Sequence, residues 1–252
     1  MLDYRKGQID RLPVVEVALS SRLGAAEILS YDFDHVALAT GSHWRADGVG
    51  RWHTKPLALD GVELLTPDDL LAGTRPAGDR VVLYDDDHYY MGGVLAELLA
   101  MEGHDVTLVT PEPRVSEWTV NTMEQHRIQR RLLELGVTAL TSRIVLSAGN
   151  GAVRTACVYT EREQELPCDS LVLVTARLPE DALAGELEAA IGGRTGPTVR
   201  LIGDAWSPGT IAAAVWDGHR YAEELDEPPS ARDEPPFLRE VIALAPLGGS
   251  SG

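Results

Sequence analysis

The stretch of sequence that decides the fold is Arg80–Pro111, which reads RVVLYDDDHYYMGGVLAELLAMEGHDVTLVTP. Its first five residues form a β-branched, apolar run that is typical of a buried strand, and the middle part, GGVLAELLAMEG, is apolar at helical spacing. Gly103 lies where a glycine commonly ends a helix, and HDVTLVTP follows as a second strand. This order predicts a βαβ unit, and therefore a parallel sheet in an α/β protein.

The segments on either side of this unit continue the alternation of strands and helices. Thr66 and Asp69 have the spacing of a capping box, which indicates the start of a short helix. The predicted helices span residues 66–73, 121–135, 181–191 and 210–225. The predicted short strands span residues 13–19, 34–40, 137–140, 144–148, 152–160, 170–175 and 199–204. From Asp226 onward the sequence predicts a linker that carries an apolar docking segment, FLREVIAL, at 237–244.

Composition and charge limit the classes of function. With 252 residues, 44% hydrophobic and 24% charged, the chain is long enough for one or two globular domains. The 22 basic and 39 acidic residues give a net charge of −17, which disfavours binding to nucleic acid and to anionic membranes. The charged N-terminus and the lack of a long apolar run indicate neither a signal peptide nor a membrane span, so we predict a cytoplasmic protein.

Two motifs at strand ends indicate a nucleotide site. HVALATG ends in Thr40, which offers a hydroxyl, and in Gly41, which allows close approach to the backbone. VRLIGDA ends in Gly203 and Asp204, an acid that lies just before a helix and has the chemistry to hold a ribose-like hydroxyl. The alternative for Asp204 is a helix cap. We therefore predict that Thr40, Gly41, Gly203 and Asp204 bind a cofactor.

The order of these motifs resembles a known architecture. An ATG turn, a complete βαβ region and then a GD strand resemble the flavoproteins with two dinucleotide-binding domains, in which an NAD domain interrupts an FAD domain. Arg80–Pro111, SEWTVNTMEQHRIQRRLLELGV, SLVLVTARLP and VRLIGDAWSPGTIAAAVWDGHRYAEELDEP further resemble the trimethylamine, dimethylamine and histamine dehydrogenases, which are relatives of 2,4-dienoyl-CoA reductase. Three tryptophans fall inside these blocks: Trp118, Trp206 and Trp216.

This resemblance implies two Rossmann-like domains, the second inserted in the first. Residues 1–75 and 190–252 would form the FAD/ADP-binding-like domain, and residues 76–189 the inserted NAD-binding-like domain. The intact family is expected to carry FMN and a 4Fe–4S cluster in an N-terminal barrel, ADP in the FAD-like site, and to pass electrons to an electron-transfer flavoprotein. Cys157 and Cys168 are the two cysteines of the chain, too few for such a cluster.

By the same resemblance, the chain begins past the family's first strand and its G-x-G-x-x-G turn, so the ADP or FAD site is incomplete and Met1 begins either a subunit or a fragment. We expect the FMN and the 4Fe–4S cluster on a larger partner chain, and no catalytic residue in this one. The predicted function is a nucleotide-binding or assembly subunit of an amine-dehydrogenase-like, demethylase-type flavin oxidoreductase. Two alternatives stay open: a self-sufficient NAD(P)H-dependent flavin oxidoreductase, and a non-catalytic scaffold with empty nucleotide sites.

The inserted domain departs from a dinucleotide fingerprint. After RVVLY come Asp85, Asp86, Asp87 and His88, with the glycines displaced to later positions, so we expect no NADH or NADPH binding there. Asp85, Asp87 and His88 have metal-ligand chemistry, but an acidic solvated turn explains them without an ion, and no metal site is predicted.

Other polar residues have simpler interpretations. The loop after the ATG turn contains residues that either cover a nucleotide or pack: His43, Trp44 and His53. Arg127, Arg130 and Arg131 are predicted to form the solvated face of an amphipathic helix. Cys157 and Cys168 are interpreted as small, reduced residues. No hydrolase or kinase motif is present in the sequence.

Overall fold

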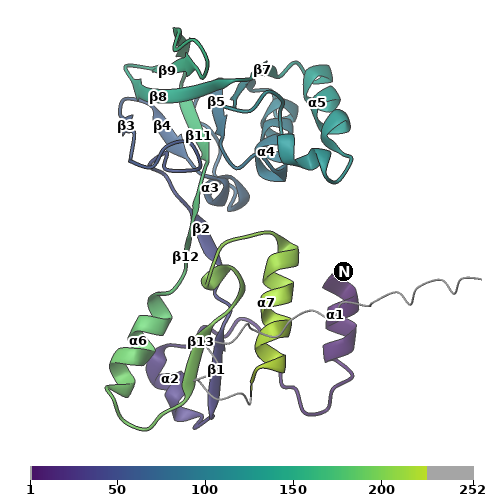
Figure 1. Cartoon of the computed structure of the whole chain (residues 1–252), viewed down its shortest axis with the longest axis vertical. Helices are drawn as coiled ribbons and strands as arrows, with labels where there is room; N and C mark the ends of the chain where they lie inside the picture. The colour runs from purple at the N-terminus through teal and green to yellow at the C-terminus, as the bar shows by residue number, and fades with distance from the viewer. Residues whose placement is uncertain (1, 226–252) are drawn as a thin grey trace, which may run out of the picture. The chain divides into compact units, whose positions relative to one another are not determined.

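The βαβ unit predicted at Arg80–Pro111 forms the centre of a five-stranded parallel sheet (Figure 1). In the computed structural model, which describes residues 2–225, β5 (Arg80–Asp85), α4 (Tyr90–Met101) and β6 (Asp105–Val109) follow one another, and β5 pairs with β6 in parallel. The sheet has the order β4-β11-β5-β6-β7, and each adjacent pair is parallel. The other strands are β4 (Glu63–Leu65), β7 (Thr138–Leu140) and β11 (Ser170–Val174). The predicted α/β class is therefore confirmed.

The described chain falls into two units. Unit 1 comprises Met1–Ala39, Asp181–Ile202 and the segment from Arg220, and unit 2 comprises Thr40–Glu180 and Gly203–His219. The sequence predicted an FAD/ADP-binding-like domain (1–75 and 190–252) interrupted by an NAD-binding-like domain (76–189). Because these domains are defined by the nucleotides that they bind, this division stays a prediction.

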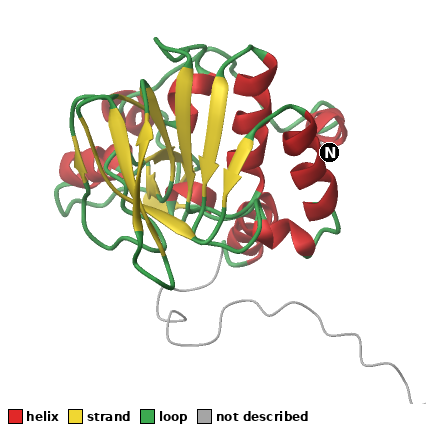
Figure 2. Ribbon diagram, turned by 90° about the horizontal axis from the view of Figure 1, so that it is seen from above, coloured by secondary structure: helices red, strands yellow, loops and turns green. Residues whose placement is uncertain are grey.

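In unit 2 the five-stranded sheet has an apolar core on each face. One core joins the sheet to α4 and α5 (Gln125–Glu134), with Leu83, Leu95 and Leu132 fully or almost fully buried. The other joins it to a four-stranded sheet of order β10-β9-β8-β3 through residues such as Tyr84 and Val145. The strands of that sheet are β3 (Ala58–Leu59), β8 (Arg143–Gly149), β9 (Ala152–Cys157) and β10 (Glu163–Pro167). Figure 2 shows the same strands in yellow and the helices in red.

Short elements complete unit 2 and carry the candidate site. β2 (Ser42–Trp44) pairs with β12 (Arg177–Pro179) in antiparallel fashion. Thr66 caps α3 (Pro67–Leu71) together with Asp69, so the predicted capping box is confirmed. The remaining elements are η1 (Glu117–Val120), η2 (Gly203–Ala205) and α7 (Ile211–Glu223), whose last residues belong to unit 1.

Unit 1 is built on a pair of parallel strands. β1 (His35–Leu38) pairs with β13 (Thr198–Leu201), and α2 (Ala25–Ser30) and α6 (Ala182–Ile191) pack beside them around the buried Leu38 and Leu187. A further helix, α1 (Leu2–Ile9), opens the described chain. Helix α6 confirms the prediction for 181–191.

Some expectations are wrong. Residues 13–19 form no strand, and their apolar side chains face solvent, with Val14 90% and Leu19 84% exposed, because alternation alone supplies no partner strand. The helix predicted from residue 121 begins only at Gln125, after the short helix η1. The predicted linker and docking segment from Asp226 lie outside the described residues. Within residues 2–225, no helix is both long and apolar enough to cross a membrane.

Candidate nucleotide site

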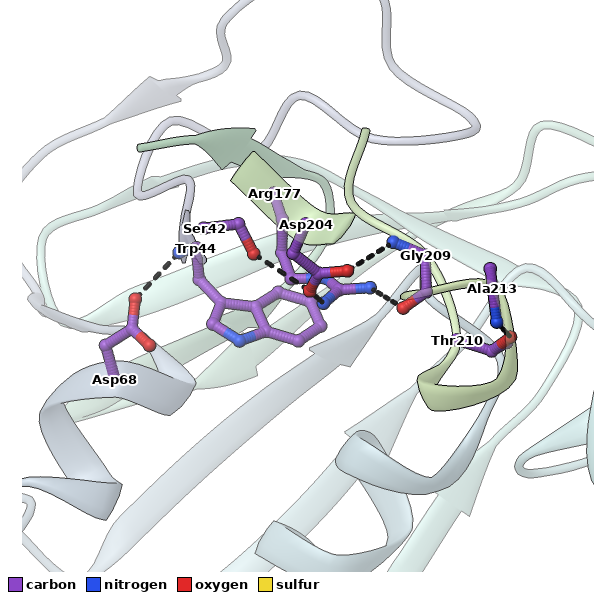
Figure 3. A network of polar contacts seen from close by, with 8 residues as sticks. All are labelled: Ser42, Trp44, Asp68, Arg177, Asp204, Gly209, Thr210 and Ala213. Carbon is purple, nitrogen blue, oxygen red and sulfur yellow. Dashed lines mark hydrogen bonds and ion pairs between the residues drawn. The ribbon is translucent and has the colours of Figure 1, made fainter. Parts of the chain in front are cut away.

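The four predicted cofactor-binding residues all lie in unit 2, at the ends of two segments far apart in sequence. Thr40 and Gly41 follow β1, and Gly203 and Asp204 form the start of η2 after β13. The hydroxyl of Ser42, the residue after Gly41, donates to Asp204 Oδ2 at 3.3 Å (Figure 3). The structure thus brings the ATG and GD motifs together.

Asp204 is the centre of this network. Its Oδ2 atom also accepts from Arg177 Nη1 at 2.6 Å, and its Oδ1 atom accepts from the amide of Gly209 at 3.0 Å. Helix α7 has another cap, because Thr210 Oγ1 accepts from the amide of Ala213 at 3.3 Å. The alternative of a helix cap for Asp204 is therefore wrong, and its carboxylate instead organises the turn before the helix.

Arg177 is the residue of this site that the sequence interpretation missed. It comes from β12, donates from Nη2 to the carbonyl of Gly209 at 2.7 Å, and lies 5.3 Å from the ring centroid of Trp44. The amide of Trp44 in turn donates to Asp68 Oδ2 at 2.7 Å (Figure 3). A sequence signal was available, since Arg177 lies inside the block SLVLVTARLP, but no local pattern shows which acid it contacts.

The residues of the two motifs differ in how much space and hydrogen-bonding capacity they leave for a ligand. Gly41 has a φ of +86°, and a Cβ placed there would meet no atom within 4 Å, so its face is open. Gly203 has a φ of +61°, but its amide already donates to Asp217 Oδ2 at 2.7 Å. The hydroxyl of Thr40 donates to the carbonyl of Glu180. Gly41 therefore offers more to a ligand than Thr40 and Gly203 do.

The donor set fits a nucleoside diphosphate such as ADP, or the ADP part of FAD. A guanidinium is a fork-shaped donor suited to phosphate oxygens, and a carboxylate accepts from ribose hydroxyls. The open glycine permits a ligand to approach the backbone closely. Arg177, Asp204 and Gly41 would hold such a nucleotide.

The acidic turn after β5 is buried, not solvated as predicted. Asp85 and Asp86 are both 0% exposed and His88 is 3% exposed. Asp85 Oδ1 accepts from the amides of Asp87 and His88 at 3.2 and 3.0 Å, and Asp86 Oδ2 accepts from the amide of Trp52 at 2.9 Å. These bonds bring backbone amides to the carboxylates, which is why the turn tolerates burial.

Burial shifts the proton affinities in this turn. It raises the pKa of Asp85 from 3.8 to about 7, against the two amide bonds that lower it. It lowers the pKa of His88 to about 4, although His88 Nε2 lies 3.5 Å from Asp86 Oδ1 and 3.7 Å from Glu112 Oε1. Within the part of the chain that the structure describes, no group of three or more His, Cys, Asp or Glu side chains has the arrangement of a metal site.

The structure also locates the other polar residues that the sequence singled out. His43 and Trp44 lie in β2, not in a loop, and the imidazole of His53 lies 6.1 Å from the ring of Tyr84. Both cysteines are free thiols. The arginines of α5 form the solvated face that was predicted, since all three are exposed. The structure adds two ion pairs, of Arg130 with Glu134 and of Arg131 with Glu97.

Known proteins resemble this chain over nearly its whole length. Histamine dehydrogenase from Rhizobium sp. 4-9 is 47% identical with a TM-score of 0.88, covering 97% of this chain and 38% of that one. The 6-hydroxypseudooxynicotine amine oxidase from Pseudomonas geniculata N1 is 38% identical with a TM-score of 0.81, covering 87% and 33%. Dimethylamine dehydrogenase from Hyphomicrobium sp. (strain x) is 33% identical over 270 residues, which cover 96% of this chain and 36% of that protein.

The chain thus spans between 33% and 38% of the length of these relatives. Residues 65–166, which run from the last residue of β4 into β10, match the family described as the OYE-like second alpha/beta domain. The chain is therefore homologous to dimethylamine dehydrogenase and histamine dehydrogenase, and its residues 65–166 are similar to the OYE-like second alpha/beta domain.

Proposed function

We propose that this chain is the nucleotide-binding and assembly portion of an amine-dehydrogenase-like flavin oxidoreductase. The observation that carries the proposal is the 47% identity to histamine dehydrogenase over 97% of the chain. The reaction of the assembly is the oxidation of a carbon bonded to an amine nitrogen, as in a demethylation. The chemistry belongs to a partner chain that holds FMN and a 4Fe–4S cluster, and an electron-transfer flavoprotein accepts the electrons.

The nucleotide held by this chain is ADP or FAD. The network around Asp204 supports this assignment, because it joins the ATG and GD motifs through Ser42 and places a guanidinium beside the acid. Gly41 leaves room for a ligand at the adjoining turn. When bound, the nucleotide supplies an adenine and phosphates that hold neighbouring parts of the assembly in place.

The sheet of unit 1 supports the need for a partner. Among residues 2–225, β1 and β13 pair only with each other, so each has an outer edge with unpaired backbone groups. A two-stranded sheet is marginal in water, and open edges favour the addition of a further strand. A partner chain that adds a strand at this sheet would complete it.

The first prediction concerns this partner. Purified from its source cell, the protein should co-purify with a larger chain whose absorption shows flavin bands at about 450 nm, since the proposed FMN is held by the partner chain. Native mass spectrometry gives the composition of the complex, and absorption gives the cofactor. A stable monomer that oxidises amines without a second chain would contradict the proposal. An excess of absorption at about 260 nm in this chain alone would identify an adenine nucleotide.

A further inference from the structure

We infer that Arg177 binds the phosphate groups of the nucleotide and makes this site selective for phosphorylated over unphosphorylated adenine ligands. The inference rests on the proposed function, because it assigns one residue of the same site. It starts from the fixed position of the guanidinium, which is 22% exposed and bonded to Asp204 Oδ2 and the carbonyl of Gly209.

The guanidinium is held on three sides. The carboxylate of Asp204 and the carbonyl of Gly209 each accept one of its N–H groups, and the indole of Trp44 lies beside it (Figure 3). Trp44 is itself anchored by the bond from its amide to Asp68. A donor fixed in this way loses little conformational entropy when a ligand binds, so Arg177 is preorganised to meet an anion.

Arg177 has hydrogen-bonding capacity left. A guanidinium carries five N–H donors, and the bonds to Asp204 and Gly209 use two of them. The donors that remain come from a side chain that is still partly accessible to solvent. Phosphate oxygens are the ligands that best match such a donor fork.

The charges around Arg177 make it necessary for an anionic ligand. Asp204 is its ion-pair partner, and the chain as a whole carries a net charge of −17. Burial raises the pKa of Asp87, and the guanidinium of Arg177 counteracts that rise, so Arg177 also lies within electrostatic range of the acidic turn. Without Arg177, the carboxylate of Asp204 would lose its ion-pair partner and would repel a diphosphate, whereas uncharged adenosine would not be repelled.

The test compares ADP with adenosine by isothermal titration calorimetry on the full chain. We expect wild type to prefer ADP, and Arg177→Met to lose at least about tenfold in ADP affinity while adenosine affinity changes by less than about threefold. Arg177→Lys should fall between them, because an ammonium keeps the charge but not the fork. The ADP preference of wild type should weaken with added salt, and that of Arg177→Met should not.

Arg130→Met is the matched control, since it removes an exposed, ion-paired arginine of the same unit and changes the net charge equally. It should leave both affinities as in wild type. Circular dichroism checks that each variant is folded. If Arg177→Met is unfolded, the ratio of ADP affinity to adenosine affinity is measured on Arg177→Lys instead. If the folded Arg177 variant has the same ratio of ADP affinity to adenosine affinity as wild type, the inference about Arg177 is overturned and the proposed nucleotide site is not. Binding of neither ligand by wild type overturns the proposed nucleotide site and the inference with it.

Discussion

At the scale of single residues, Asp85 shows how this fold replaces a glycine-rich turn with a carboxylate. Just before α4, Asp85 Oδ1 accepts hydrogen bonds from the amides of Asp87 and His88. These two amides are therefore not free to donate to a phosphate. Its other oxygen, Oδ2, is buried without a partner in the described residues. An acid in this position is stable chiefly in its protonated form.

The second prediction is that Asp85→Asn stabilises unit 2 at neutral and alkaline pH. Burial raises the pKa of Asp85 from 3.8 to about 7, so the folded state binds this proton more tightly than the unfolded state. The stabilisation by the proton is complete below about pH 4 and is lost as pH rises to 7. The ionised form then costs up to about 4 kcal/mol, at about 1.4 kcal/mol per pKa unit. Urea unfolding of both proteins from pH 4 to 8 measures the difference.

His88 acts in the opposite direction and provides the control. Its pKa falls from 6.5 to about 4, so it destabilises the folded state as pH decreases from 6.5 towards 4. His88→Asn removes this titration, and asparagine tolerates the φ of +66° at this position. The increase in the free energy of unfolding caused by Asp85→Asn should grow with pH both in wild type and in the His88→Asn variant. A gain that is independent of pH would show that Asp85 titrates normally.

At the scale of elements, the start of α4 depends on Gly92. A Cβ at Gly92 would lie 2.4 Å from Asp85 Cγ, whose carboxylate is already fixed by two amide bonds. The helix can therefore lie against the end of β5 only because this position has no side chain. The displaced glycine of the sequence motif is thus explained by packing against a carboxylate.

The third prediction follows from this contact. Gly92→Ala should destabilise the protein by up to about 2 kcal/mol, because an overpacked contact costs about 1–3 kcal/mol and alanine recovers only about 1 kcal/mol of helix propensity. Gly218→Ala is the matched control, since a Cβ there meets no atom within 4 Å in α7, and it should stabilise slightly. Unfolding in urea measures both. If Gly92→Ala were as stable as Gly218→Ala, the contact with Asp85 would be flexible.

At the scale of the whole molecule, the carboxyl ends of β5 and β11 form one edge of the sheet. After β5, aspartates stand where a dinucleotide fingerprint would have glycines. The strand order reverses between these strands, and ligands of α/β sheets bind at such a point. Here the edge contains Asp85 and Asp86, both fully buried. The sheet therefore has the strand-order reversal that is typical of α/β ligand sites, with buried carboxylates at that point.

The fourth prediction is that this edge binds neither NADH nor NADPH. The amides of Asp87 and His88 at this edge already donate to Asp85 Oδ1, so they are not free to bind a pyrophosphate. Each carboxylate of the turn that is ionised adds about 4 kcal/mol of repulsion to a phosphate charge at about 4 Å and an effective dielectric of about 20, whereas a helix N-terminus contributes at most about 2 kcal/mol. Titration of the full chain with either nucleotide, followed by fluorescence, should give no saturable signal in the micromolar range. ADP in the same assay serves as the comparison. Saturable binding that Asp204→Ala leaves intact would place a nicotinamide site at β5 and overturn this prediction.

The sequence by itself determined the local elements and their order. The βαβ unit at Arg80–Pro111 and the capping box at Thr66 were predicted because strand alternation, helical spacing and capping depend on neighbouring residues. Strands such as β2 and β12 were missed because they are three residues long and are stabilised by pairing with each other. Residues 13–19 were assigned wrongly for the converse reason, since their pattern has no partner strand in the described chain.

Only the tertiary structure decided which side chains meet. The sequence identified Thr40, Gly41, Gly203 and Asp204 as candidates, but the ion pair of Asp204 with Arg177 joins residues 27 positions apart, and the bond from Ser42 spans 162 positions. The same holds for Asp85, whose burial was not visible in an acidic run that is normally solvated. Long-range packing fixes the distance between such groups and their exposure to water, and these two quantities set the charge and the hydrogen-bonding capacity of the site.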